Sequence, residues 1–247
     1  MRFLVLAAGQ GTRLRPLTDN IPKCMVPLQG KPLLEHLLDT ARQVGLTDLH
    51  VATGYREEVI DYPGVVKHQN PRYDSTNMVA TLFCAEEIMD DELIVSYGDI
   101  VYQPDVLAAL VASSAEVSVV VDREWKRYWQ ARMENPLDDA ETLKLGSNGE
   151  IRELGKKAKS YDEIEGQYIG LMKFRKDALE KIRPFYHRLD KEARYDGKDF
   201  ENMYMTSFLQ LIADRLMPLT PVFIENGWME VDAVSDLEFT RFLHRQA

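Results

Sequence analysis

The amino-terminal stretch, residues 1–27, constrains the fold of this chain more than any other segment. Residues 3–7 form an apolar run without charge or alternation, which is typical of a strand buried on both faces. Gly9 and Gly11 follow directly, and glycine allows the backbone to turn sharply and to approach a ligand closely. Successive backbone N–H groups in such a loop form a concave site for an anion. The stretch therefore predicts a buried strand that ends in an anion-binding loop.

Positive charge is concentrated in the same region. Residues 2–31 contain five Lys or Arg residues and a single acid, whereas the whole chain of 247 residues has a net charge of −10. Arg13, Arg15 and Lys23 therefore follow the strand in a locally basic segment, which indicates a site for a polyphosphate. The alternative is an ordinary strand-to-helix turn with solvated charges. The acidic total predicts no nucleic-acid partner, because such affinity needs a basic surface.

Three short motifs occur in this stretch in order and without gaps. They are Leu-Ala-Ala-Gly-Gln-Gly-Thr-Arg-Leu at residues 6–14, Pro-Leu-Thr at 16–18 and Pro-Lys at 22–23. The run resembles the signature of the nucleotidyltransferase family that makes nucleotide-diphosphate sugars and CDP-activated alcohols. Two other glycine loops fit less well, since a dinucleotide fingerprint needs a third Gly where Leu14 stands and a P-loop needs Gly-Lys-Ser/Thr.

The resemblance implies a fold and a set of nucleotide contacts. The implied fold is α/β, a Rossmann-like three-layer sandwich with a mostly parallel mixed sheet, of the nucleotide-diphospho-sugar transferase type. Arg13 and Lys23 would be the catalytic cations, with Arg13 on the triphosphate and Lys23 between the α-phosphate and the acceptor. The implied nucleotide contacts are Leu6, Ala7, Ala8, Gly9, Gly11, Thr12, Arg13, Asn77 and Gly98.

Strands and helices alternate along the chain, which favours a parallel sheet. Hydrophobic spacing and turn residues give their approximate bounds. The predicted strands are residues 3–7, 48–53, 65–68, 92–97, 116–122, 165–174 and 221–225, and a Gly-Ser-Asn-Gly loop at 146–149 predicts a hairpin. The predicted helices are residues 32–44, 57–61, 75–89, 104–114, 176–188, 199–216 and a last one that a capping box at 235–238 begins.

We expect one domain over residues 1–247. Its nucleotide-binding part spans about 1–122, an acceptor-binding insert and lid about 123–220, and a closing metal-binding strand and helix 221–247. Two cysteines are too few for a disulfide framework or a Cys-rich metal site. The chain has no signal-peptide pattern and no long apolar run, so we expect a cytoplasmic enzyme without a membrane partner. An oligomer is possible.

Two aspartates far apart in the sequence are candidate metal ligands. Asp99 follows Gly98 at the end of a predicted strand, and ligands bind at the carboxyl ends of strands in an open parallel sheet. Magnesium is usually held by one or two carboxylates together with substrate phosphates and water. Asp99 matches the Gly-Asp metal ligand of the family, and Asp232 matches the family's Asp just ahead of its last helix, with Glu230 a weaker candidate. The resemblance therefore implies Mg²⁺; an isolated Gly-Asp would more often be a plain turn.

The acceptor is expected in residues 123–174. Trp125, Trp129 and Asp139 suit a small cationic alcohol or amine, since aromatic faces and carboxylates attract ammonium groups. Alternatively, the two Trp form one side of a packed helix and the acids are solvated. The resemblance adds Lys23, Lys156, Glu165 and Tyr168 as acceptor contacts, with Lys157 an equal candidate to Lys156. The sugar-reading residues that usually follow the Glu are absent here, which puts a hexose-1-phosphate acceptor in doubt.

These observations predict a magnesium-dependent nucleotidyltransferase. The partners are a nucleoside triphosphate, with CTP favoured, and a small phosphate or phosphonate such as phosphocholine, phosphoethanolamine, aminoethylphosphonate or a phosphorylated amino-acid amide. Pyrophosphate is the second product. The alternatives are a sugar-1-phosphate nucleotidylyltransferase that uses dTTP, UTP or GTP, and a non-catalytic subunit that binds nucleotide. The retained cations and aspartates favour the enzyme over the silent subunit.

Overall fold

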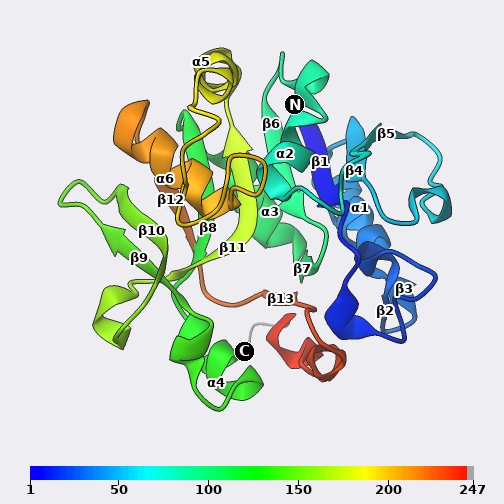
Figure 1. The fold of residues 1–247 in the computed structure, drawn as a ribbon. Helices are drawn as coiled ribbons and strands as arrows, with labels where there is room; N and C mark the ends of the chain where they lie inside the picture. Colours follow the sequence, from blue (N-terminus) through cyan, green and yellow to red (C-terminus); the bar gives the residue numbers. More distant parts are fainter. Residues whose placement is uncertain (244–247) are drawn as a thin grey trace.

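The computed structural model describes residues 1–243, and its centre is a mixed β-sheet (Figure 1). Within those residues the sheet has seven strands in the order β12-β8-β11-β6-β1-β4-β5. Only β11 is antiparallel to its neighbours in this sheet. These strands are β1 (Arg2–Ala7), β4 (Leu49–Thr53), β5 (Val65–Gln69), β6 (Leu93–Tyr97), β8 (Val117–Asp122), β11 (Gln167–Phe174) and β12 (Thr220–Ile224).

Helices cover both faces of this sheet. Alternate residues of β1 enter different cores, with Phe3 and Val5 in one and Leu4 and Leu6 in the other. The first core also takes apolar residues from α1 (Leu33–Gln43), α3 (Pro104–Ala112) and α4 (Trp125–Arg132). The second takes those of α2 (Met78–Phe83), α5 (Lys176–His187) and α6 (Met205–Arg215). The predicted three-layer α/β sandwich with a mostly parallel mixed sheet is therefore confirmed.

Short strand pairs complete the fold. The predicted hairpin is present as β9 (Glu141–Leu145) and β10 (Ile151–Lys157). Strand β2 (Pro27–Leu28) pairs with β3 (Lys31–Pro32), and β7 (Ile100–Tyr102) pairs antiparallel with β13 (Trp228–Glu230). The pairing of β7 with β13 brings the last part of the chain beside the end of β6.

Three predicted helix starts are wrong, and the first is that of the helix predicted at 75–89, which begins at Met78. The predicted helix 199–216 begins only at Met205, because the Asp199 carboxylate accepts the N–H of Asn202 and closes a separate turn. The predicted capping box at 235–238 is also wrong. Residues Val234–Glu238 form a 3₁₀ turn with Ala233 at its N-cap position, and Oδ2 of Asp236 inside the turn accepts the N–H groups of residues 232 and 233. The last four residues of the predicted closing part, 244–247, lie outside the described residues.

No helix in residues 1–243 has the length and apolar character needed to span a bilayer.

Candidate active site

The glycine loop after β1 is folded tightly over Lys23. Gly11 has φ 66°, a left-handed conformation that favours glycine, and a Cβ there would lie 2.9 Å from Cβ of Lys23. The carbonyl of Gly11 accepts the hydroxyl of Thr18 at 2.8 Å, and that of Gly9 accepts the N–H of Lys23 at 3.3 Å. The loop thereby places the Lys23 side chain at the carboxyl end of β1.

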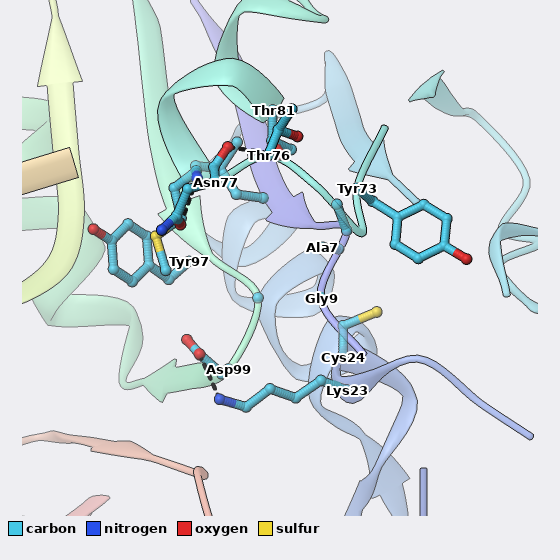
Figure 2. A pocket seen from close by; sticks show the side chains of 14 residues that line it. Ala7, Gly9, Lys23, Cys24, Tyr73, Thr76, Asn77, Thr81, Tyr97 and Asp99 are labelled. Atoms are coloured by element: carbon cyan, nitrogen blue, oxygen red, sulfur yellow. Dashed lines mark hydrogen bonds and ion pairs between the residues drawn. The ribbon is translucent and has the colours of Figure 1, made fainter. Parts of the chain in front are cut away.

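A cavity of about 160 Å³ opens at this end of the sheet, between the glycine loop, the start of α2 and the end of β6 (Figure 2). Gly98 allows the close approach of β6 to β1, because a Cβ there would lie 2.7 Å from the carbonyl oxygen of Leu6. Figure 2 shows Asn77 and Tyr97 on one side of the cavity and Tyr73 on the other. The lining residues are Leu6, Ala7, Ala8, Gly9, Lys23, Cys24, Tyr73, Thr76, Asn77, Met78, Thr81, Tyr97, Gly98 and Asp99.

Asn77 both caps α2 and lines this cavity. Its Oδ1 accepts the N–H of Met78 at 2.8 Å, so the cap is Asn77 itself rather than Ser75 or Thr76. The nearby Thr76 hydroxyl accepts a hydrogen bond from Asn70 and donates one to a backbone carbonyl. The side chain of Asn77 thus caps α2 and lines the cavity at the same time.

The ammonium of Lys23 joins the two predicted metal ligands. It donates to Oδ2 of Asp99 at 2.7 Å and to Oδ1 of Asp232, and all three side chains are about 15% exposed. Arg13 approaches from the surface, with its Nη2 3.1 Å from Oδ2 of Asp232. Lys23 therefore meets residues that lie 76 and 209 positions further along the chain, as Figure 2 shows for Asp99.

The β7–β13 pairing explains how these acids meet. Glu230 lies opposite Ile100 in the ladder, and the N–H of Val231 donates to the carbonyl of Asp99 at 2.8 Å. Asp232 follows directly. Among the described residues, ligand atoms of Asp99, Glu230 and Asp232 lie within 4.8 Å of one another.

This carboxylate cluster fits a hard divalent cation. Mg²⁺ prefers oxygen ligands, and one or two carboxylates with substrate phosphates usually suffice. Oδ1 of Asp99 is buried and has no hydrogen-bond partner in the part of the chain that the structure describes. A buried carboxylate oxygen without a partner is costly, so an added cation would satisfy it.

The charges of the site perturb one another's pKa. Burial would lower the pKa of Lys23, but Asp99 and Asp232 outweigh it and raise that pKa well above its usual value. Burial would raise the pKa of Asp232, but Lys23 lowers it below its usual value. Burial, and then Asp232 and Asp99, raise the pKa of Glu230. Burial also raises the pKa of the Cys24 thiol to about 12, which makes Cys24 a packing residue rather than a reactive one.

A second cavity of about 220 Å³ adjoins the first and shares Met78 and Tyr97 with it. Among the described residues, its wall includes three acids and no Lys or Arg. The Nε1 of Trp129 donates to Asp139 at 3.0 Å, which orients that carboxylate. The lining residues are Met78, Tyr97, Ile100, Trp129, Asp139, Glu141, Gln167, Tyr168, Ile169, Gly170, Tyr204, Met205, Thr206, Trp228 and Glu230.

Three of the predicted acceptor residues lie away from both cavities. Trp125 is 4% exposed and packs in the core with the rest of α4, as the packed-helix alternative supposed. Lys156 pairs with Glu153 at 3.0 Å and lines an outer groove. The carboxylate of Glu165 accepts the N–H of Leu145, so it fastens the β9–β10 hairpin. The structure thus places these three side chains against structural partners outside the two cavities.

The other predicted residues lie in or beside the two cavities. Trp129, Asp139 and Tyr168 line the second, while Gly11, Thr12 and Arg13 form the loop beside the first. Sequence reasoning missed several lining residues, namely Tyr73, Thr76, Thr81, Glu141, Gln167, Tyr204 and Thr206. Glu141 had a signal as one of the acids of the insert. Tyr204 had none, because its position matched the apolar spacing of a core helix.

Sequence and fold are similar to those of several characterised proteins. The profile of the MobA-like NTP transferase domain matches residues 3–192. The CTP:phosphoglutamine cytidylyltransferase of Campylobacter jejuni is 45% identical over 249 residues, which cover 96% of this chain and 98% of that protein. The structure of the CTP:phosphocholine cytidylyltransferase of Streptococcus pneumoniae superposes with a TM-score of 0.72 at 23% identity, over 98% of this chain and 99% of that one. The inositol-1-phosphate CTP transferase of T. maritima gives 0.73 at 19% identity, over 98% and 93%.

Proposed function

The chain belongs to the MobA-like NTP transferase family, and we propose that it transfers CMP from CTP to a small phosphorylated acceptor that carries an amine. The observation that carries this proposal is the 45% identity, over nearly the full length of both chains, to a CTP:phosphoglutamine cytidylyltransferase. A phosphorylated amino-acid amide is among the acceptors that the sequence predicts. The two adjoining cavities support it, because one follows the glycine loop and the other is acidic and aromatic.

The reaction joins two anions. An oxygen of the acceptor phosphate attacks the α-phosphorus of CTP, a new P–O bond forms, and the bond to the departing pyrophosphate breaks. The protein has no covalent step to perform, so its main tasks are alignment and neutralisation of charge. In our proposal the nucleotide occupies the first cavity and the acceptor the second, so that both phosphates meet at the shared boundary.

The cations of the loop supply much of that neutralisation. Arg13 is exposed on the glycine loop and would bind the triphosphate and the charge that develops on the leaving group. Lys23 is held by Asp99 and Asp232 at the cavity floor and would lie between the α-phosphate and the acceptor. Its raised pKa keeps it charged at neutral pH.

Asp99 and Asp232, with Glu230 beside them, would hold magnesium. When bound, the ion would neutralise phosphate charge and orient the two substrates. The unpartnered Oδ1 of Asp99 supports this assignment.

The acceptor's amine would lie in the second cavity. Asp139 provides a negative charge there, and Glu141 provides part of one, because burial and then Asp139 raise its pKa to about 7. Trp129, Tyr168 and Tyr204 provide aromatic surface. An ammonium group loses little when it leaves water for such a site, because the carboxylates replace its hydration.

A pyrophosphate-release panel tests this function. Four nucleoside triphosphates are crossed with phosphoglutamine, phosphocholine, aminoethylphosphonate and glucose 1-phosphate in the presence of Mg²⁺. We expect turnover with CTP and an amine-bearing acceptor, and loss of it in Asp99→Asn. Strong turnover of glucose 1-phosphate with dTTP or UTP, without turnover of the amines, would overturn the cytidylyl assignment. Silence of every pair together with tight CTP binding would support a regulatory subunit instead.

A further inference from the structure

Helix α4 contacts the segment that carries two of the proposed metal ligands, Glu230 at the end of β13 and Asp232 just after it. The hydroxyl of Tyr128, on α4, accepts the N–H of Glu230 at 2.8 Å and donates to the carbonyl of Glu230 at 3.1 Å. Tyr128 is 1% exposed, so both hydrogen bonds are shielded from water. One phenol oxygen thereby satisfies both backbone groups of Glu230.

Arg132, one turn further along α4, binds the side chains of the same region. Its Nη1 is 3.0 Å from Oε2 of Glu230, and its Nε and Nη2 donate to the two oxygens of Asp236 at 3.1 and 3.2 Å. The Arg132 side chain is 2% exposed, and its guanidinium lies over the rings of Tyr128 and Trp129. A bidentate pair of this kind fixes direction as well as charge.

Asp236, which Arg132 holds in place, in turn holds the backbone at Asp232. Its Oδ2 accepts the N–H of Asp232 and the N–H of Ala233, both at 2.8 Å. The carboxylate is 6% exposed. Asp232 thus has its backbone held by Asp236, which Arg132 in turn holds in place.

We propose that Tyr128, Arg132 and Asp236 form a clamp that positions Glu230 and Asp232 for the metal ion. The three are positioning residues, because none of them belongs to the carboxylate cluster itself. The inference rests on the proposed function. It assigns a role to the aromatic and basic helix α4 other than contact with the acceptor. Groups that orient metal ligands typically change metal affinity or activity 10- to 100-fold when they are removed.

Two variants test the clamp, Asp236→Ala and Tyr128→Phe. Mn²⁺ replaces Mg²⁺ as a probe, and its dissociation constant is measured by EPR on the folded protein without substrates. We expect Asp236→Ala to weaken Mn²⁺ binding at least about 10-fold, because the backbone of Asp232 loses its anchor and Arg132 keeps only Glu230 of its two carboxylate partners. Tyr128→Phe removes a single oxygen and should weaken Mn²⁺ binding less. This variant still tests the clamp if Asp236→Ala does not fold.

Matched controls separate positioning from general stability. Asp177 is also paired bidentately with an arginine, Arg175, and accepts a backbone N–H, but it follows β11 at the end of the sheet where β6 begins, opposite to the site. Tyr195 likewise donates its hydroxyl to a backbone carbonyl away from the cluster. Asp177→Ala and Tyr195→Phe should leave Mn²⁺ affinity and the Mg²⁺ dependence of turnover unchanged.

The possible outcomes distinguish failure of the clamp from failure of the proposed function. If the folded Asp236→Ala and Tyr128→Phe variants bind Mn²⁺ as the parent does and lose only thermal stability, the clamp is overturned and these residues are structural. If the parent turns over no substrate pair, the proposed function fails, and Mn²⁺ binding still decides the clamp. Weakened Mn²⁺ binding in both variants, with unchanged controls, supports it.

Discussion

Lys23 lies between two carboxylates, and its replacement tests the catalytic centre at the level of a single charge. In Lys23→Ala, Asp99 and Asp232 face each other without the ammonium, and the proposed phosphates lose a cation at the point where they meet. We expect turnover to fall about 10²- to 10³-fold or more, as when other charge-stabilising donors are removed. The measurement is pyrophosphate release at saturating substrates, with circular dichroism as a check that the fold survives.

Arg13 and Arg15 form a matched pair for the same question. Arg15 pairs only with Asp19 at the surface, whereas Arg13 reaches Asp232. Arg13→Ala should therefore approach the loss seen for Lys23→Ala, and Arg15→Ala should stay near the parent rate. Near-normal turnover of Arg13→Ala would remove it from the catalytic centre.

Replacement of Asp99 should change the dependence of turnover on the magnesium concentration. Asp99→Asn keeps the size of the side chain but removes the charge that the unpartnered Oδ1 would offer to a cation. We expect the Mg²⁺ concentration for half-maximal rate to rise at least about 10-fold or activity to vanish. A magnesium titration that is the same as the parent's would show that Asp99 is no ligand.

At the scale of elements, the contact between α4 and the segment just before β9 allows a test of which acceptor the protein binds. The Trp129 indole orients Asp139, and an Asn at 139 could accept that same N–H while carrying no charge. In Asp139→Asn we expect KM for amine-bearing acceptors to rise roughly 10- to 100-fold, since a hydrogen bond to a charged group contributes about 1.5–3 kcal/mol. KM for CTP should change little. Asp138→Asn, one residue away and outside the cavity, is the control; an equal effect there would argue against a specific contact.

The strands and the mostly parallel sheet could be predicted because they depend on local patterns. The apolar runs, the glycines and the Gly-Asp after β6 are all short signals. The role of α4 could not be predicted. Both Trp125 and Trp129 are aromatic residues of this helix, but only Trp129 lines one of the two cavities, and the sequence does not distinguish them. The place of Lys156 could not be predicted either. It pairs with Glu153, three residues earlier in β10, and lies outside the two cavities.

The edge of the sheet, at β4 and β5, contains a buried histidine pair. We expect this pair to make the stability of the fold depend on pH. Nδ1 of His50 lies 2.9 Å from Nε2 of His68, and the pair is flanked by Asp48 and Glu87. Burial, and then His50, lower the pKa of His68, which Glu87 only partly offsets. The unfolded chain therefore binds a proton that the folded chain resists, so stability should fall as pH drops below about 6.5, by at most about 1.4 kcal/mol per pH unit.

Melting temperatures between pH 8 and pH 5 measure this effect. His68→Gln keeps a donor for His50 but cannot be protonated, so its melting temperature should depend less on pH over this range. The same acid slope in parent and variant would assign the acid sensitivity to other groups.

At the scale of the whole molecule, the site depends on segments from the two ends of the chain. The glycine loop and Lys23 come from the first 23 residues, Asp99 from the middle, and Glu230 and Asp232 from the end of β13 and the residues after it. The proposed substrates would bridge these segments and so bind the folded chain but not the unfolded one. A ligand of that kind stabilises the whole fold by mass action.

CTP with Mg²⁺ should therefore raise the melting temperature of the whole domain. At 100 times its Kd a ligand adds about 2.7 kcal/mol, and each kcal/mol shifts the midpoint of a chain of this size by roughly 2–4 °C, which gives a rise of roughly 5–11 °C. Without a divalent cation the same CTP concentration should give a smaller rise, and Asp99→Asn should make the rises with and without Mg²⁺ similar, because the cation links Asp99 to the nucleotide in our proposal. UTP and dTTP at that concentration are the controls. An equal rise for all three would contradict selection of the cytosine base by this fold, and no rise for any of them would contradict a nucleotide site formed by both ends of the chain.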